Sequence, residues 1–338
     1  MSDHINPVWV IGEKVDGNIP PICFEIIGQA RKLADELDAP VEVLLFGKGI
    51  RDRVDSLFHA GADVVHVGDA TGFEVYQSEI YLASITALVD ERKPQIMLIG
   101  STFMGRELAP LIAAKLGTGL SAHCIDLVLD EDGILEQQIP AYGGLMSIIC
   151  PDKRPQIATV ARGVFPMPTL DESRSGKILQ VDPPPEMITR VKTLEVVHVE
   201  PKGLPLETAP VVVAGGAGAG SSEGWQEIAE LAEALNAALG STRPAVDEGW
   251  TDLETMIGQS GRMVSPEIYI GIGLSGEQQH MVGIMGAKLM IAINNDPKSP
   301  VFGQVDIGIV EDCRQFVPAL VKALKEMESD PVRATHVV

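Results

Sequence analysis

Three apolar runs in the C-terminal part of this 338-residue chain each end in a turn of small polar residues. Ile268–Ile272 is followed by Gly-Leu-Ser-Gly, residues 288–294 by Asn-Asp, and residues 305–310 by Glu-Asp. Continuous apolar strands are typical of parallel sheets buried on both faces, which bind ligands at the carboxyl ends of their strands. The runs therefore predict a parallel α/β sheet with a nucleotide at its polar edge.

A fourth apolar run, residues 211–214, leads into the glycine-rich segment 215–220. A helix over residues 225–239, ended by Gly240, is expected to follow, because apolar residues recur there at helical spacing: Ile228, Leu231, Leu235 and Leu239. A strand, a glycine loop and a helix can hold a phosphate. The spacing is G-x-G-x-G, so the G-x-G-x-x-G dinucleotide fingerprint is not met.

Strands and helices also alternate from the start of the chain to residue 116, which predicts a doubly wound parallel sheet. The expected strands are residues 7–12, 41–46, 64–67 and 96–99, and the expected helices are residues 21–37, 54–59 and 75–89. Residues 121–164 are glycine-rich and strand-like, and we interpret them as an antiparallel extension of the sheet.

The segment 100–106, Gly-Ser-Thr-Phe-Met-Gly-Arg, follows a predicted strand and opens a predicted helix. Its backbone N–H groups could hold a phosphate. It lacks the Lys-Ser/Thr pair of a P-loop. We therefore favour a strand-to-helix turn capped by Ser101 or Thr102.

Proline-rich residues 165–208, interrupted by one expected strand at 191–199, are interpreted as a connector between two domains. The predicted organisation is an N-terminal α/β domain over residues 1–164, a second domain over residues 209–330 and a tail at 331–338.

Net charge, cysteine content and the length of apolar runs limit the partners, metal sites and membrane segments that can be expected of this chain. The formal net charge of −21 argues against nucleic acid or an anionic membrane as a partner. The four cysteines show neither a CxxC pair nor metal-ligand spacing, so we expect buried free thiols in a reducing cytoplasm and no metal site. We expect no secretory signal, and no apolar run approaches the ~20 residues of a membrane span.

Several short motifs between residues 242 and 312 carry a family resemblance: TRPAVDEGW, IGQSG, SPEIYIGIGLSG, QQH, INNDP and PVFGQVDIGIVED. In this order they resemble the FAD-binding domain of the electron-transfer flavoprotein alpha subunit. The resemblance implies an FAD-binding subunit that pairs with a beta subunit, while the N-terminal domain serves assembly. It leaves open whether the complex bifurcates electrons.

The implied role is to carry electrons between a flavin dehydrogenase, such as an acyl-CoA dehydrogenase, and a redox acceptor such as ferredoxin or a quinone reductase. Two alternatives stay open. One is an NAD- or thiamine-dependent enzyme with the same sheet topology, and the other is a regulatory nucleotide-binding subunit. No lysine, cysteine or acid–base pair is convincingly placed for covalent or proton-transfer chemistry, so we expect no substrate turnover of its own.

The resemblance places several residues around the flavin ring. Arg243 matches a cation against the ring, and Thr242 lies beside it. Ser260 matches a hydroxyl that hydrogen-bonds flavin N5. His280 matches a histidine that faces the flavin O2 edge and favours an anionic reduced form; a structural role is the alternative for a lone histidine. Gly258 and Gln259 are expected to line the same turn as Ser260.

The rest of the cofactor is assigned in the same way. Ser275, Gly276 and Gln279 are expected to cradle the pyrophosphate and ribityl oxygens at the start of a helix. Asn294 and Asp312 match positions that hold the adenosine half, with ordinary turn capping as the alternative.

The chain departs from the family pattern at four positions. Ala217 stands where the family usually has an arginine after the two glycines of the first loop. Pro244 replaces a small non-proline residue, and Glu277 and Gln278 occupy positions that are commonly apolar. These changes leave FAD binding expected but put the usual flavin potential in question.

Overall fold

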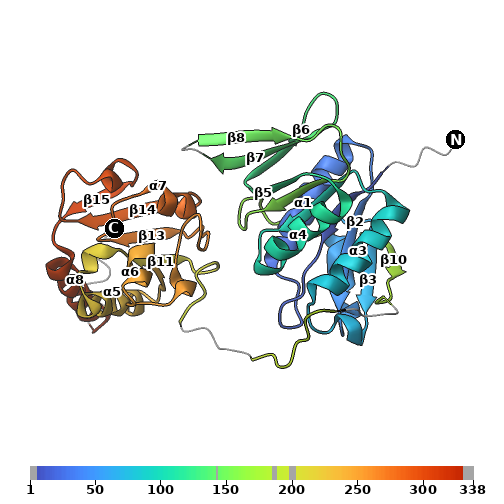
Figure 1. The fold of residues 1–338 in the computed structure, drawn as a ribbon. Coiled ribbons are helices and arrows are strands. Elements are labelled where there is room, and N and C mark those ends of the chain that lie inside the picture. The colour runs from blue at the N-terminus through green and yellow to red at the C-terminus, as the bar shows by residue number, and fades with distance from the viewer. Residues whose placement is uncertain (1–5, 142–143, 185–188, 198–202, 330–338) are drawn as a thin grey trace. The chain divides into compact units, whose positions relative to one another are not determined.

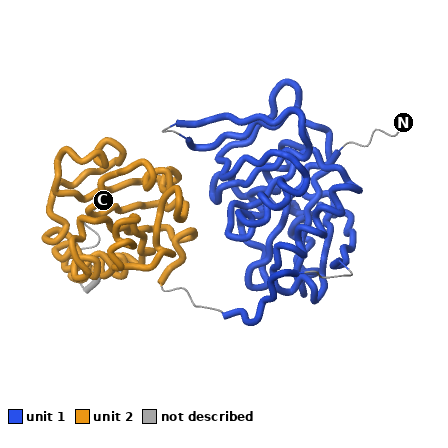
Figure 2. Tube along the Cα trace, viewed as in Figure 1, with its two compact units in different colours: residues 1–197 blue, residues 198–338 orange. Residues whose placement is uncertain are grey.

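The computed structural model describes residues 6–141, 144–184, 189–197 and 203–329. The chain divides into two compact units, an N-terminal unit, Met1–Val197, and a C-terminal unit, His198–Val338 (Figure 2). In the described residues, no helix is both long and apolar enough to span a membrane.

The N-terminal unit is built on a seven-stranded parallel sheet with the order β10-β3-β2-β1-β4-β9-β5 (Figure 1). Its strands are β1 (Val8–Ile11), β2 (Val41–Gly47), β3 (Val64–Asp69), β4 (Ile96–Gly100), β5 (Leu120–Cys124), β9 (Gln156–Val160) and β10 (Lys177–Gln180). The predicted doubly wound sheet is confirmed.

Helices cover both faces of this sheet because the central strands are apolar on both sides. One apolar core packs under α1 (Pro21–Glu36) and α2 (Val54–Ala60). The other packs under α3 (Ser78–Arg92) and α4 (Phe103–Leu116). Two single 3₁₀ turns, η1 (Arg51–Arg53) and η2 (Thr71–Phe73), lie between these elements.

The antiparallel extension is confirmed as a separate three-stranded sheet of β6 (Asp126–Leu129), β7 (Leu135–Ala141) and β8 (Gly144–Ile149). The prediction was wrong for β5 and β9, because residues 121–124 and 156–160 were assigned to this extension but belong to the parallel main sheet. Strand β9 lies between β4 and β5, and all five of its residues are buried. The apolar run of β9 is compatible with a parallel or an antiparallel strand, because the direction of pairing depends on tertiary contacts that the sequence does not show.

The turn after β4 is a capped helix start. Thr102 Oγ1 accepts a hydrogen bond from the Gly105 N–H at 3.0 Å, as expected of an N-cap. The same hydroxyl donates to the buried Glu13 carboxylate at 2.6 Å. The favoured interpretation of segment 100–106 is therefore confirmed.

The proposed connector partly belongs to the N-terminal unit. Strand β10 lies within it and pairs with β3 along the edge of the sheet. The strand expected at 191–199 was wrong for residues 191–197, which have no regular secondary structure. Residues 198–199 lie outside the described part of the chain.

The C-terminal unit contains a five-stranded parallel sheet with the order β12-β11-β13-β14-β15 (Figure 1). Its strands are β11 (Val211–Gly215), β12 (Ala238–Ser241), β13 (Ile268–Ile272), β14 (Leu289–Asn294) and β15 (Ile307–Val310). The three apolar runs at 268–272, 288–294 and 305–310 thus contain the adjacent strands β13, β14 and β15, and the predicted parallel sheet is confirmed.

Long helices cover one face of this sheet and short segments the other. The helices α5 (Ser222–Ala234) and α8 (Cys313–Ser329) share one core with the strands. The opposite core includes the short helix α7 (Gln278–Met281) and the turns η5 (Val282–Ile284) and η6 (Pro300–Gly303). The remaining short elements are η3 (Ala217–Ala219), α6 (Arg243–Asp247) and η4 (Leu253–Thr255).

The helix predicted over residues 225–239 is too long at its C-terminal end. Helix α5 ends at Ala234, and Asn236 then adopts a left-handed φ of +48° that asparagine tolerates. Leu239 is consequently a strand residue in β12. Gly240 lies inside that strand, where an added Cβ would come 2.4 Å from Ile257 Cδ1. This correction places Thr242 and Arg243 at the end of a strand.

Candidate functional site

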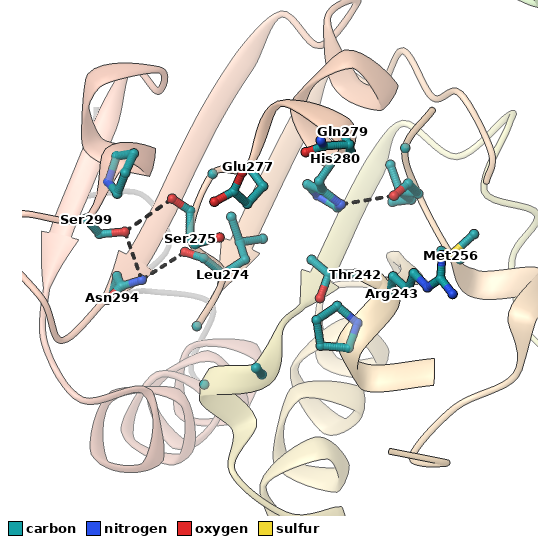
Figure 3. Close-up of a pocket in the computed structure, with 18 of the residues that line it drawn as sticks. Thr242, Arg243, Met256, Leu274, Ser275, Glu277, Gln279, His280, Asn294 and Ser299 are labelled. Carbon is teal, nitrogen blue, oxygen red and sulfur yellow. Dashed lines mark hydrogen bonds between the residues drawn. The ribbon is translucent and has the colours of Figure 1, made fainter. Parts of the chain in front are cut away.

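A cavity of about 610 Å³ lies at the carboxyl ends of the C-terminal unit's strands (Figure 3). Its volume falls within the ~300–1,000 Å³ typical of small-molecule and cofactor sites. Every strand of the sheet contributes a lining turn: 217–218 after β11, 242–244 after β12, 273–277 after β13, 294–296 after β14 and Cys313 after β15. The loop 256–261 and residues 279–280, 299 and 300 complete the wall.

Ten of the eleven residues assigned to the cofactor from sequence line this one cavity: Thr242, Arg243, Gly258, Gln259, Ser260, Ser275, Gly276, Gln279, His280 and Asn294. Asp312 is not among the lining residues. It lies at the start of α8, where its carboxylate accepts from the Arg314 N–H at 2.9 Å. That is the turn-capping alternative, and contact of Asp312 with a cofactor stays a prediction.

The loop 256–261 is fixed against α7 by backbone contacts. Gly258 has a φ of +137°, and a Cβ there would lie 2.4 Å from the Gln279 carbonyl oxygen. The next residue, Gln259, donates its N–H to that same oxygen at 2.7 Å. Only glycine permits this approach, so the loop carries Ser260 to the cavity on a rigid base.

The turn after β13 is held in a similar way. Gly276 has a φ of +82°, and a Cβ would lie 2.6 Å from Val301 Cα. Asn294 Nδ2 donates to the Leu274 carbonyl at 2.8 Å and to Ser299 Oγ at 3.3 Å (Figure 3). Asn294 therefore braces two adjacent turns, and its role toward an adenosine group stays a prediction.

Helix α7 has only four residues, Gln278–Met281. A helix this short supplies little dipole, so the cradle expected at its start consists of the turn backbone and the Ser275 and Gln279 side chains. Among the departures from the family pattern, Glu277 lines the cavity and Gln278 does not. Pro244 lies in the first turn of α6, where its missing N–H costs little.

His280 is buried, with 6% of its surface exposed. Its Nδ1 lies 3.1 Å from the Ile257 carbonyl oxygen and its Nε2 lies 2.6 Å from the Tyr269 hydroxyl. Burial lowers its pKa to about 4, with the Ile257 bond acting in the opposite direction. The ring is therefore neutral at physiological pH.

Charge in the cavity is sparse. Arg243 lines it with a side chain that is 75% exposed and that donates to Asp247 at 3.3 Å. Glu277 and Asp296 are the lining carboxylates among the described residues. Ala217 lines the cavity and is exposed. The position at which the family usually has an arginine is therefore accessible but carries no charge in this chain.

These residues fit FAD, the cofactor that the resemblance implies. Its ring edges and ribityl chain need donors and acceptors, which hydroxyls of Thr242, Ser260 and Ser275 and amides of Gln259 and Gln279 provide. Its diphosphate needs close backbone approach, which the glycines in the turns that line this wall, such as Gly218, Gly273 and Gly276, would allow.

Sequence reasoning missed several residues of the site. Tyr269 was treated as one member of an apolar run, although its hydroxyl contacts His280. Ser299 follows INNDP closely enough to have been considered as a turn brace. Met256 and Cys313 line the cavity without a sequence signal that marks them.

Comparison with protein families gives two adjacent matches. The Electron transfer flavoprotein domain matches residues 8–186. The Electron transfer flavoprotein FAD-binding domain matches residues 205–285, which include most of the cavity wall.

Individual relatives agree over nearly the whole chain. The chain is 38% identical over 331 residues to the electron transfer flavoprotein subunit alpha of Thermoanaerobacterium thermosaccharolyticum, covering 97% of this chain and 100% of that protein. It is 37% identical to the subunit alpha of Megasphaera elsdenii, covering 95% and 97%. It is 35% identical to the lactate dehydrogenase (NAD(+),ferredoxin) subunit LctC of Acetobacterium woodii, covering 96% and 78%. The chain therefore belongs to the electron transfer flavoprotein alpha-subunit family, and its C-terminal unit is an FAD-binding domain.

Proposed function

We propose that this protein holds FAD in the cavity of its C-terminal unit and works as the alpha subunit of a heterodimeric electron carrier. The observation that carries the proposal is that ten of the eleven residues assigned from the family resemblance line one cavity at the ends of five parallel strands. The matched families favour this function over a nucleotide-dependent enzyme or a regulatory subunit.

Within this proposal, FAD supplies the redox chemistry, accepting and releasing electrons when bound. The chain supplies binding and electrostatics. Arg243 provides a permanent positive charge, Ser260 provides a hydroxyl on a fixed loop, and His280 provides a buried neutral ring. Ser275, Gly276 and Gln279 are the proposed cradle for the pyrophosphate.

The proposed protein partners are based on the matched family and on one relative, LctC. We propose a beta subunit as the permanent partner, in the cytoplasm, and a flavin dehydrogenase of the acyl-CoA dehydrogenase type as the electron donor. The name of LctC ties that relative to lactate, NAD and ferredoxin, so a complex that uses ferredoxin is a second acceptor route to test.

The test is to co-express the chain with the beta subunit encoded in the same genome and to record the visible spectrum of the purified pair. We expect a heterodimer with a flavin band that bleaches on reduction and returns when ferredoxin or a quinone reductase is added. A colourless pair that binds another nucleotide would contradict the carrier function. A flavin-loaded monomer would contradict the pairing alone.

A further inference from the structure

Tyr269 and His280 form a buried pair beneath the cavity. Tyr269 lies on β13 with 0% of its surface exposed, and its hydroxyl lies 2.6 Å from His280 Nε2. The Ile257 carbonyl oxygen lies 3.1 Å from His280 Nδ1. Three segments of the unit, β13, the loop after η4 and α7, therefore meet at one imidazole.

The protons on this pair follow from the chemistry of the partners. A carbonyl oxygen can only accept, so Nδ1 carries the hydrogen that it donates to Ile257. In a neutral imidazole Nε2 is then an acceptor, and the Tyr269 O–H donates to it. Both ring nitrogens are committed to protein groups. The ring therefore has no free N–H to offer to a bound molecule.

We propose that Tyr269 is a positioning residue of the FAD site, whose hydroxyl holds His280 as the neutral Nδ1–H tautomer and keeps a second positive charge out of the cavity. Protonation at Nε2 would make that nitrogen a donor. The hydroxyl hydrogen of Tyr269 would then lose its acceptor. Among the described residues, His280 is the hydrogen-bond partner of the Tyr269 hydroxyl.

The surroundings of His280 agree with a neutral ring. The charged groups that line the same cavity are Arg243 on α6, Glu277 before α7 and Asp296 after β14. None of them is among the causes of the low pKa of His280, which are burial and, acting in the opposite direction, the Ile257 bond. Arg243 is thus the cation that this part of the structure presents to FAD. A neutral His280 with both ring nitrogens bonded runs against the expectation that it favours an anionic reduced flavin.

The role of this pair toward FAD rests on the proposed function, whereas the tautomer of His280 can be measured whether or not FAD binds. The first test is therefore made on the complex with its beta subunit after FAD removal, with the alpha chain labelled with ¹⁵N-histidine. His280 is assigned by comparison with the His280→Gln variant. We expect the ¹⁵N pattern of an Nδ1–H tautomer that stays neutral between pH 5 and pH 8. An Nε2–H tautomer, or a positive charge in that range, would overturn the proposal.

The second test is Tyr269→Phe. Loss of a hydrogen bond to the neutral ring should raise the His280 titration midpoint by about 0.7 pH unit, as expected for a bond worth ~1 kcal/mol. In the FAD-loaded complex, the flavin potential should then rise on going from pH 8 to pH 5 by more than in the wild type. An unchanged midpoint and an unchanged potential would show that Tyr269 only fills the core.

The matched control is Tyr81→Phe in the N-terminal unit. Tyr81 is also buried, and its hydroxyl donates to the Phe46 carbonyl oxygen at 3.1 Å. It should lose comparable stability and leave the His280 signals as in the wild type. If both variants moved those signals equally, the effect would be general destabilisation and the proposal would fail. If Tyr269→Phe does not fold, the wild-type tautomer still decides the proposal.

Discussion

At the level of single residues, the two basic side chains of the cavity differ in burial and therefore in charge. Arg243 has a side chain that is 75% exposed, and water screens much of its charge. His280 is 6% exposed and neutral, because desolvation opposes its charged form. The sequence resemblance placed both residues against the flavin, but the sequence does not contain the tautomer or the exposure that decides their charge.

The first prediction concerns Arg243. A nearby permanent cation stabilises the negative charge that the flavin gains on reduction, by about 1 kcal/mol in this exposed setting. Arg243→Ala should therefore lower the flavin potential or weaken FAD retention about five-fold. Potentiometric titration of the FAD-loaded complex measures the flavin potential, and the flavin content of the purified complex measures FAD retention. Lys288→Ala, which removes an exposed cation paired with Glu267 outside the cavity, should change neither quantity.

The second prediction concerns acid stability. Because the pKa of His280 is lowered to about 4 in the folded protein, the unfolded chain takes up a proton at higher pH than the folded chain does. Stability is lost as pH falls from about 6.5 towards 4, by up to ~3 kcal/mol. Urea unfolding of wild type and His280→Gln at pH 7 and pH 5 checks this. Equal pH dependence in both proteins would refute it.

At the level of secondary-structure elements, the glycine loop after β11 is held by Arg314 from α8. The Arg314 guanidinium donates to the Ala219 carbonyl oxygen at 3.3 Å and to Ser221 Oγ at 3.1 Å. A cation therefore holds the loop, while the exposed Ala217 faces the cavity.

The third prediction follows from that exposure. Ala217→Arg should tighten FAD binding, because a new cation near the cofactor is worth between about 1 and 4 kcal/mol at ~4 Å, and an exposed site lies at the lower end. Ala217→Gln, similar in length without the charge, should not tighten it. FAD release in mild chaotrope measures both. Faster release from the arginine variant would mean that the pocket no longer accepts this side chain.

The elements also show where sequence reasoning succeeds and fails. Long apolar runs such as Ile268–Ile272 predicted their strands, because burial on both faces leaves one interpretation. Strand β12 was missed, because Ala-Leu-Gly-Ser continues the spacing of α5 and its pairing with β11 is non-local. The site followed from the family motifs, whereas Tyr269 was missed because its role depends on a contact across eleven residues.

At the scale of the whole molecule, each unit has its own apolar cores, and the N-terminal unit also contains a buried ionic cluster. Glu42 is 0% exposed and accepts from Trp9 Nε1 at 3.0 Å, from His66 and from Arg92. Burial raises its pKa, but the bonds from His66 and Arg92 outweigh burial and hold the pKa at about 2. Glu42 is therefore ionised at neutral pH.

The fourth prediction is that Glu42→Gln destabilises the protein by about 3 kcal/mol, because removing one member of a buried ionic cluster leaves the others unpaired. Thermal unfolding at pH 7 measures this loss. Glu74→Gln, which removes an exposed carboxylate paired with Lys48, should cost less than ~1 kcal/mol. Similar losses in the two variants would contradict the importance of burial.

The affinity of the FAD-free complex for FAD shows directly whether FAD occupies the cavity at the strand ends. Gly276 has a φ of +82° and no room for a Cβ, whereas Gly303, near it on η6, has open space around the Cβ position. Fluorescence titration should show tight binding for the wild type and for Gly303→Ala, and about five- to 150-fold weaker binding for Gly276→Ala, since backbone strain of ~1–3 kcal/mol falls on the cradle. Wild-type affinity in Gly276→Ala, or no FAD binding by the wild type, would mean that FAD does not occupy this cavity.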